Sequence, residues 1–288
     1  MSAAIQFVLL IVLAPLLQGL MRSIRARLQG RPGPSPFQVY RDLRKLWGKE
    51  AVMPTAGSPI IVAAPGIVLG VAITFAALMP PLIGDTSLQV NAIALALLLA
   101  LSRFALVLAA LDTRSGFAAM AASREMTFAS LTEAPLILAL FSAAFSGHDS
   151  LGYLRGEQSS VSGVLAAGAL LLVMLSETAR VPVDNQETHY ELTMIHEGLI
   201  LEYSGWQLAL LQAAAYIRQG AFFLLAAFML PGSNAVSLIW IGAFIVIIPY
   251  VERTYAKLRL FEVPQLFASA VVLALASIGL RIAGLGTW

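Results

Sequence analysis

The sequence predicts an all-α membrane protein with about eight transmembrane helices and one interfacial amphipathic helix. Only 12% of the 288 residues are charged, whereas soluble domains carry about 25% charged residues. The apolar residues form continuous runs, and a transmembrane helix needs about 20 of them in succession. They do not alternate with polar residues, so a transmembrane β-barrel is disfavoured. Lipid is therefore the expected solvent, and residues 1–288 form a single integral membrane domain.

Eight apolar runs define the predicted spans. We place them at about 3–21, 59–83, 89–111, 126–147, 161–179, 207–230, 236–252 and 263–283. Arginine residues follow the first run and do not precede it, which predicts a retained anchor and not a cleaved signal peptide.

Residues at about 36–48, between the first two spans, predict a short amphipathic helix. Apolar residues recur along one face: Val39, Tyr40, Leu43, Leu46 and Trp47. Charged residues occupy the opposite face: Arg41, Asp42, Arg44 and Lys45. This pattern is typical of a helix that lies in the membrane interface.

The distribution of lysine and arginine predicts the orientation. Eight spans put both termini on one side and the loops after the odd-numbered spans on the other. Those loops hold most of the basic residues: Arg22, Arg25, Arg27, Arg31, Arg41, Arg44, Lys45, Lys49, Arg114, Arg124, Arg180, Arg253, Lys257 and Arg259. The other loops hold only Arg155. The positive-inside rule therefore predicts a multi-pass protein of a bacterial or archaeal cytoplasmic (inner) membrane, with N- and C-termini outside.

An acidic loop at about 180–205, together with the end of the preceding span, is the most informative segment. It holds six of the chain's 16 acidic residues: Glu177, Asp184, Glu187, Glu191, Glu197 and Glu202. Crowded buried carboxylates raise one another's pKa and can hold protons near neutral pH. A solvated acidic loop with a helix cap is the simpler alternative. Glu177 and Arg180 are one helical turn apart, so they can pair.

Charged residues also fall inside the predicted spans: Arg103, Glu133, Glu177 and Arg218. A charge at the bilayer centre costs about 2.5–3.5 kcal/mol on insertion scales, so such residues face protein or water. They form either ion pairs that hold helices together or a polar track. Pro135 lies close to Glu133, and a proline there frees a backbone carbonyl and invites a polar partner.

Three motifs carry a family resemblance. The acidic motif is Glu177-x-x-Arg180-x-Pro182-x-Asp184-x-x-Glu187-x-x-x-Glu191-Leu192, closing with Glu202-Tyr203-Ser204-Gly205. The second is Arg27-Leu-Gln-Gly30-Arg31-x-Gly33-Pro34, followed by the amphipathic helix, and the third runs from Arg253 to Pro264. In this order they resemble the complex I subunit that joins the redox arm to the membrane arm, and the related membrane-anchor subunits of formate hydrogenlyase and other energy-converting (group 4) NiFe hydrogenases. Ala179 and Val183 favour the hydrogenase branch.

The resemblance implies a non-redox membrane subunit that anchors a peripheral redox arm and couples electron transfer to ion translocation. It implies no catalytic residue in this chain. The coupling path would use carboxylates with basic counter-charges: Glu133, Glu177, Asp184, Glu187, Glu191, Glu197, Glu202, Arg103, Arg180 and Arg218. Docking of the redox arm would use exposed basic residues: Arg27, Arg31, Arg41, Arg44, Lys45, Arg253 and Arg259.

The chain has no cysteine, so it offers no iron–sulfur cluster and no thiolate metal site, and we expect no cofactor or metal in it. The resemblance assigns the NiFe centre and iron–sulfur clusters to partners, namely hydrogenase large- and small-subunit-like proteins and a ferredoxin-like iron–sulfur subunit. Antiporter-like subunits would accompany the chain in the lipid, and no feature points to nucleic acid.

Two alternatives stay open. The first is the corresponding membrane subunit of an NADH- or other donor:quinone oxidoreductase, with a quinone site between the amphipathic helix and the acidic loop. The second is a stand-alone secondary transporter, which predicts inverted repeats that the sequence does not show.

Overall fold

The computed structural model describes residues 3–52, 54, 57–80, 91–144, 161–184, 194–232 and 234–283. Regular secondary structure in these ranges is entirely helical. The helices are α1 (Ala3–Leu28), α2 (Gln38–Trp47), α3 (Pro59–Ala77), α4 (Ala92–Asp112), α5 (Gly116–Ala144), α6 (Val161–Glu177), α7 (His196–Leu199), α8 (Gly205–Met229), α9 (Asn234–Thr254) and α10 (Val263–Ile282).

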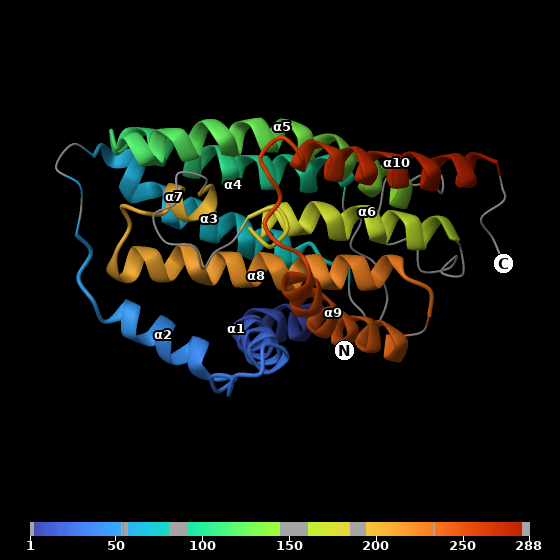
Figure 1. The fold of residues 1–288 in the computed structure, drawn as a ribbon, viewed down its shortest axis with the longest axis horizontal. Coiled ribbons are helices and arrows are strands. Elements are labelled where there is room, and N and C mark those ends of the chain that lie inside the picture. Colours follow the sequence, from blue (N-terminus) through green and yellow to red (C-terminus); the bar gives the residue numbers. More distant parts are fainter. Residues whose placement is uncertain are drawn as a thin grey trace.

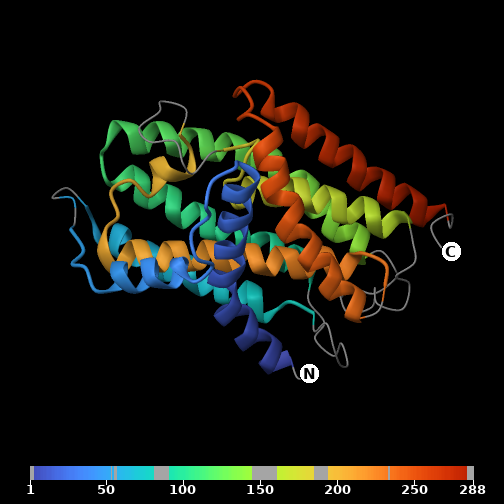
Figure 2. The same ribbon diagram turned by 60° about the horizontal axis from the view of Figure 1, so that its bottom comes forward.

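The long helices form one bundle in which α8 is the most deeply buried helix. In Figure 1, α3, α4, α5, α6, α8 and α10 run in the same general direction, along the long axis of the molecule. Helix α8 is largely buried and packs against α1, α2, α3, α6 and α9. Helix α1 crosses this direction steeply, since it is seen nearly end-on in Figure 1 and passes across α8 in Figure 2. Polar side chains of α8 therefore reach several neighbouring helices from inside the bundle.

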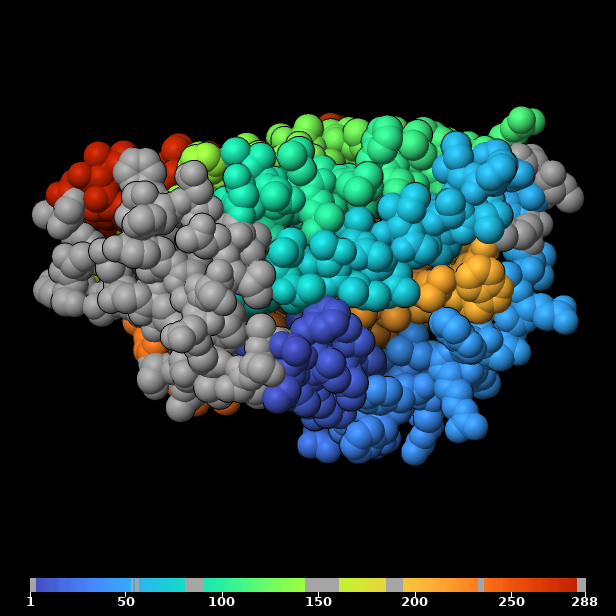
Figure 3. Space-filling view, turned by 180° about the vertical axis from the view of Figure 1, so that it is seen from behind, coloured from blue at the N-terminus to red at the C-terminus, as the bar shows by residue number. Residues whose placement is uncertain are grey.

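The outer surface of the bundle is apolar, as a lipid-facing surface must be. Large hydrophobic side chains are exposed on several helices, among them Leu97, Phe104, Ile239 and Val272. Figure 3 shows that α3, α4 and α5 lie at the surface on one side of the molecule. Exposed large apolar side chains on so many helices mark contact with a membrane or a partner. The predicted class, an all-α membrane protein, is confirmed.

Six of the described helices are long and apolar enough to cross a membrane: α1, α3, α4, α8, α9 and α10. Helix α6 is apolar but shorter, with 17 residues. Helix α5 has 29 residues, and Arg124, Glu125 and Glu133 interrupt its apolar sequence. The total of eight spans therefore stays a prediction.

Helix α1 continues beyond the predicted end of the first span at residue 21 and ends at Leu28. The arginines that we assigned to a loop, Arg22 and Arg25, belong to its last turns. Their guanidinium groups have partners on other helices: Arg22 Nη2 lies 3.4 Å from the Tyr216 hydroxyl and Arg25 Nη1 lies 3.2 Å from Glu252 Oε2. Inter-helix partners can hold charged residues in a helix that hydropathy alone would end.

The predicted amphipathic helix is present as α2. Val39 is buried, and α2 packs on α1 and α8. The Tyr40 hydroxyl donates a hydrogen bond to the Val12 carbonyl of α1. Phe37 and Trp47 are exposed at the two ends of the helix. Helix α2 runs alongside α8 in both ribbon views (Figures 1 and 2), and its position in the bilayer interface stays a prediction.

The segment after α2 is fastened to the start of α8. The Val52 N–H donates to Ser204 Oγ at 2.7 Å, and Ser204 Oγ donates to the Val52 carbonyl at 3.3 Å. Gly205 has φ 55°, and a Cβ added there would lie 2.4 Å from the Glu50 carbonyl oxygen. Glycine is therefore required at this contact, both for its backbone conformation and for the close approach.

Candidate functional site

The acidic motif begins where α6 ends. Helix α6 stops at Glu177, and Ala179 has φ 50°, a left-handed conformation that L-residues adopt at a cost of about 1–2 kcal/mol. The chain then forms a turn in which the Asp184 N–H donates to the Arg180 carbonyl at 3.0 Å. Because the helix stops between them, Glu177 and Arg180 do not share a helical face. The predicted pairing of these two residues is wrong.

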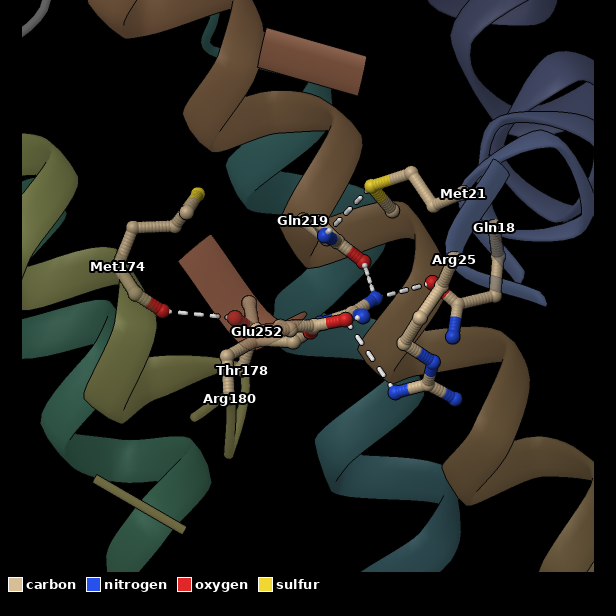
Figure 4. Close-up of polar contacts among 8 residues, drawn as sticks. All are labelled: Gln18, Met21, Arg25, Met174, Thr178, Arg180, Gln219 and Glu252. Atoms are coloured by element: carbon tan, nitrogen blue, oxygen red, sulfur yellow. Dashed lines mark hydrogen bonds and ion pairs between the residues drawn. The ribbon is translucent and has the colours of Figure 1, made fainter. Parts of the chain in front are cut away.

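Arg180 instead lies at the centre of a buried polar cluster (Figure 4). We use the name Arg180 cluster for Gln18, Arg25, Arg180, Gln219 and Glu252. Arg180 Nη1 lies 2.7 Å from Glu252 Oε1, and Arg180 Nη2 donates to Gln219 Oε1 at 2.8 Å and to Gln18 Oε1. The second Glu252 oxygen lies 3.2 Å from Arg25 Nη1. One carboxylate is thus shared by two guanidinium groups, and the cluster joins α1, α8 and α9 to the turn after α6.

Arg103 of α4 joins a buried carboxylate to a carboxylate at the surface. Its Nη1 lies 3.4 Å from Glu177 Oε1 and donates to Thr132 Oγ1 at 2.9 Å. Its Nη2 lies 3.5 Å from Glu133 Oε1. The Glu177 side chain is 1% exposed and the Glu133 side chain is 45% exposed. The residues predicted as counter-charge and acids therefore lie together, although their role is not tested by this geometry.

A small inner cavity of about 30 Å³ adjoins this group. Its lining includes six ionisable side chains: Arg103, Glu125, Glu177, Asp184, His196 and Arg218. Within the described residues, Arg103 Nε, Glu177 Oε2 and Arg218 Nε are buried without a hydrogen-bond partner. A site for one water needs about 10–15 Å³ and polar partners. The inner cavity meets both conditions and has room for about two waters.

A larger outer cavity of about 260 Å³ lies between α1, α7 and α8. Three guanidinium groups line it, those of Arg22, Arg25 and Arg180, together with Glu197 and Tyr216. The outer and inner cavities share three lining residues: His196, Ile200 and Leu211. The two cavities are therefore separated by a wall one residue thick in places.

Asp184 fixes the backbone around His196. Asp184 Oδ2 accepts a hydrogen bond from the His196 backbone N–H at 3.0 Å, and Asp184 Oδ1 lies 2.7 Å from Lys257 Nζ. Burial, assisted by the positive charge of Arg218, lowers the pKa of the His196 imidazole to about 4, although the Asp184 carboxylate opposes this shift. The imidazole is therefore neutral at neutral pH.

The other predicted acids divide into three groups. Glu197 lines the outer cavity. Glu202 is half-buried and belongs to the lining of neither the inner nor the outer cavity. Glu187 and Glu191 lie outside the described residues.

The predicted docking residues share one property, exposure to solvent: Arg27, Arg31, Arg41, Arg44, Lys45, Arg253 and Arg259. Exposure makes them available to a partner, while their docking role stays a prediction.

Two carboxylates of the site were not predicted. Glu252 falls at the end of the predicted span 236–252, so the rule that selected Glu133, a charge inside an apolar run, applied equally to it. Glu125 lies one residue before the predicted span 126–147, so that rule did not reach it. Gln18 and Gln219 also lie within predicted spans, where a buried amide needs partners. Glu252, Gln18 and Gln219 carry the same signal, polarity within an apolar run.

Comparison with known proteins gives the family. The model of the NADH dehydrogenase family matches residues 1–282. Formate hydrogenlyase subunit 4 of Escherichia coli (strain K12) is 32% identical over 285 residues, which cover 91% of this chain and 92% of that protein. Hydrogenase-4 component C of the same organism is 36% identical over 229 residues, 75% of this chain and 70% of that protein. NADH-ubiquinone oxidoreductase chain 1 of Carassius auratus is 30% identical over 207 residues, 68% of this chain and 63% of that protein.

A solved structure has the same fold. One chain of the membrane-bound sulfane sulfur reductase, an archaeal respiratory membrane complex, superposes with a TM-score of 0.79. The match covers 97% of this chain and 99% of that chain at 21% identity. With the family model matching almost the whole length, the resemblance seen in the sequence motifs is confirmed, and the chain belongs to the NADH dehydrogenase family.

Proposed function

We propose that this chain is the non-redox membrane subunit of a membrane-bound NiFe hydrogenase or hydrogenlyase complex. It anchors the peripheral redox arm and couples electron transfer to ion translocation. Similarity to formate hydrogenlyase subunit 4 and hydrogenase-4 component C supports the type of complex. The observation that carries the coupling role is the row of charged side chains from the outer cavity, past the inner cavity, to Glu133.

The Arg103 pairs give this row a physical means of transmitting charge. Two unit charges attract more strongly in a protein interior than in water, because the effective dielectric constant is lower. A proton that neutralises Glu177 removes one of the two carboxylates that attract Arg103, so the guanidinium is drawn toward Glu133. A charge change at the inner cavity is thereby felt at the surface of α5.

Glu133 indicates where a membrane partner binds. Its side chain is 45% exposed on a helix that also exposes the large apolar side chains of Met126, Ile137 and Phe141. A carboxylate facing hydrocarbon costs about 2.5–3.5 kcal/mol on insertion scales. A neighbouring membrane subunit that covers Glu133 with a polar group removes this cost. We assign this face of α5 to an antiporter-like subunit of the complex.

The exposed basic residues of α2 and of the 253–259 segment suit docking of the redox arm. In this proposal the NiFe centre and iron–sulfur clusters reside in hydrogenase large- and small-subunit-like proteins and a ferredoxin-like subunit on the cytoplasmic side. The termini of this chain then lie on the opposite side of the membrane.

Carboxamide variants test the coupling role. Glu177→Gln and Glu133→Gln keep the side-chain shape and remove the titratable group. Hydrogen evolution with artificial donors should persist in the assembled complex, because the redox centres lie in other subunits. Activity that depends on or generates a proton gradient should fall. Glu50→Gln, at an exposed site outside both cavities, is the matched control. Full gradient-linked activity in both assembled variants would contradict the proposal.

A quinone site is the second candidate function, supported by the similarity to NADH-ubiquinone oxidoreductase chain 1 and by the outer cavity of about 260 Å³. Its arginine-rich lining suits a polar headgroup and not an apolar tail. The purified complex separates the two functions: nickel without quinone reduction supports the hydrogenase, and quinone reduction without nickel supports the reductase.

A further inference from the structure

We propose that His196 is the proton-relay residue between the outer and the inner cavity. The inference rests on the proposed function, because it assigns one step of the coupling path to one residue. The observation behind it is that three residues line both cavities, His196, Ile200 and Leu211, and so form the wall between them. Ile200 and Leu211 are buried hydrocarbon side chains. Hydrocarbon neither donates nor accepts a proton, so the imidazole is the part of the wall through which a proton can pass.

Charged groups face His196 from both sides. In the inner cavity these are Arg103 of α4, Glu125 of α5, Glu177 at the end of α6, Asp184 and Arg218 of α8. In the outer cavity they are Arg22 and Arg25 of α1, Arg180 and Glu197. Both cavities are therefore polar, and His196 lies between the two polar regions.

A neutral imidazole suits this position because one ring nitrogen carries a proton and the other accepts one. The accepting nitrogen takes a proton from water in one cavity, and the other nitrogen releases its proton to water in the second cavity. The ring then regains its original tautomer by rotating or exchanging its proton. One proton crosses the wall in each cycle, and the charge of His196 is the same before and after.

The position of the imidazole is set by tight packing of α7. The His196 backbone N–H is bonded to Asp184, which is itself held by Lys257. Two residues further on, a Cβ added at Gly198 would lie 2.6 Å from Ala121 Cβ of α5. Helix α7 thus packs on α5 at a distance that only glycine permits, which keeps His196 in the wall.

The test uses the intact complex in proteoliposomes. His196→Ala should leave hydrogen evolution with artificial donors unchanged and reduce coupled proton uptake by about 10²-fold, the lower range for loss of a positioned proton-transfer group. Added imidazole should restore uptake, since the outer cavity adjoins the space left by the side chain. N-methylimidazole has nearly the same size but cannot pass a proton from one nitrogen to the other, so it should not restore uptake.

Two control variants separate the possible outcomes. His196→Gln fills the space, so imidazole should not restore its uptake, and it keeps the assay informative if His196→Ala does not assemble. Normal proton uptake in either assembled His196 variant overturns the relay, as does rescue by N-methylimidazole or a loss that imidazole does not reverse in His196→Ala. Glu177→Gln tests the proposed function independently. If Glu177→Gln abolishes coupling while the His196 variants retain it, the relay fails and the proposed function stands. If Glu177→Gln, Glu133→Gln and the His196 variants all retain coupling, the proposed function itself fails.

Discussion

Replacing Glu252 by glutamine tests how much the Arg180 cluster stabilises the packing of α1, α8 and α9 on the acidic motif. The Glu252 side chain is 3% exposed and lies 2.7 Å from Arg180 and 3.2 Å from Arg25. Glutamine has nearly the same shape, but it leaves the guanidinium of Arg180, itself 5% exposed, without a carboxylate. Removing one partner of a buried ion pair costs about 3–5 kcal/mol. Arg180 keeps Gln18 and Gln219, so we expect the lower end of that range.

The matched control is Asp42→Asn, which also removes one carboxylate charge. Asp42 lies 3.8 Å from Arg22 in a pair whose side chains are 42% and 35% exposed. Exposed pairs of this kind contribute about 0.2–1 kcal/mol. Thermal unfolding in detergent, followed by tryptophan fluorescence, compares the two variants. At about 2 °C per kcal/mol for a chain of this size, Glu252→Gln should unfold at least about 6 °C below the parent protein and Asp42→Asn within about 2 °C.

Equal unfolding temperatures for the two variants would refute the conclusion that the Glu252 carboxylate stabilises the helix packing. A double-mutant cycle with Arg180→Gln provides a second check. Residues that interact directly show coupling energies of about 0.5–3 kcal/mol. If the effects of Glu252→Gln and Arg180→Gln simply add, the two side chains do not stabilise the fold through each other.

Four further outcomes test other parts of the structure. Gly198→Ala should destabilise the protein by about 1–3 kcal/mol through overpacking, and adding Ala121→Gly should recover part of that loss in thermal unfolding. Since the folded-state pKa of His196 lies near 4 and the unfolded value near 6.5, stability should be lost as pH falls from 6.5 toward 4, and the unfolding temperature of His196→Gln should fall less over that range. Reversing the charges of the three basic residues of α2 should release the soluble subunits from membranes while the spans still insert; unchanged co-purification would leave α2 a lipid-binding helix. In this cysteine-free chain, a cysteine at Ser35 should be protected from an impermeant reagent in intact cells and one at Ser87 should react, whereas the opposite labelling would reverse the proposed topology.

Hydropathy and charge patterns predict most of the fold, because lipid imposes simple requirements on each helix. The predicted spans at 207–230 and 263–283 agree with α8 and α10 to within two residues. The pattern of α2 identifies its buried face through Val39. Such patterns depend only on neighbours along the chain, which is why they can be recognised in the sequence.

The sequence predictions fail where an ion pair or a helix end depends on residues far away along the chain. Glu177 and Arg180 were predicted to pair because they are one helical turn apart, but α6 ends at Glu177 and the left-handed conformation of Ala179 follows. Arg103 and Glu252 then supply partners from 74 residues before Glu177 and 72 residues after Arg180. Arg25 was assigned to a loop because it follows the first apolar run, and its partner, Glu252, lies 227 residues further along the chain. The two cavities likewise depend on the packing of several helices, which spacing along the chain does not encode.

The fastening between the segment after α2 and the start of α8 has a mechanical consequence. Ser204 is bonded to both the N–H and the carbonyl of Val52, and Gly205 is in contact with the backbone at Glu50. This segment and the first turn of α8 must therefore move as one body, because any relative displacement breaks these hydrogen bonds or forces the backbones together. Arg218 lies further along the same rigid helix and lines the inner cavity. A displacement of the segment that follows α2 would therefore move α8 as well, and with it Arg218 among the charged groups of the inner cavity.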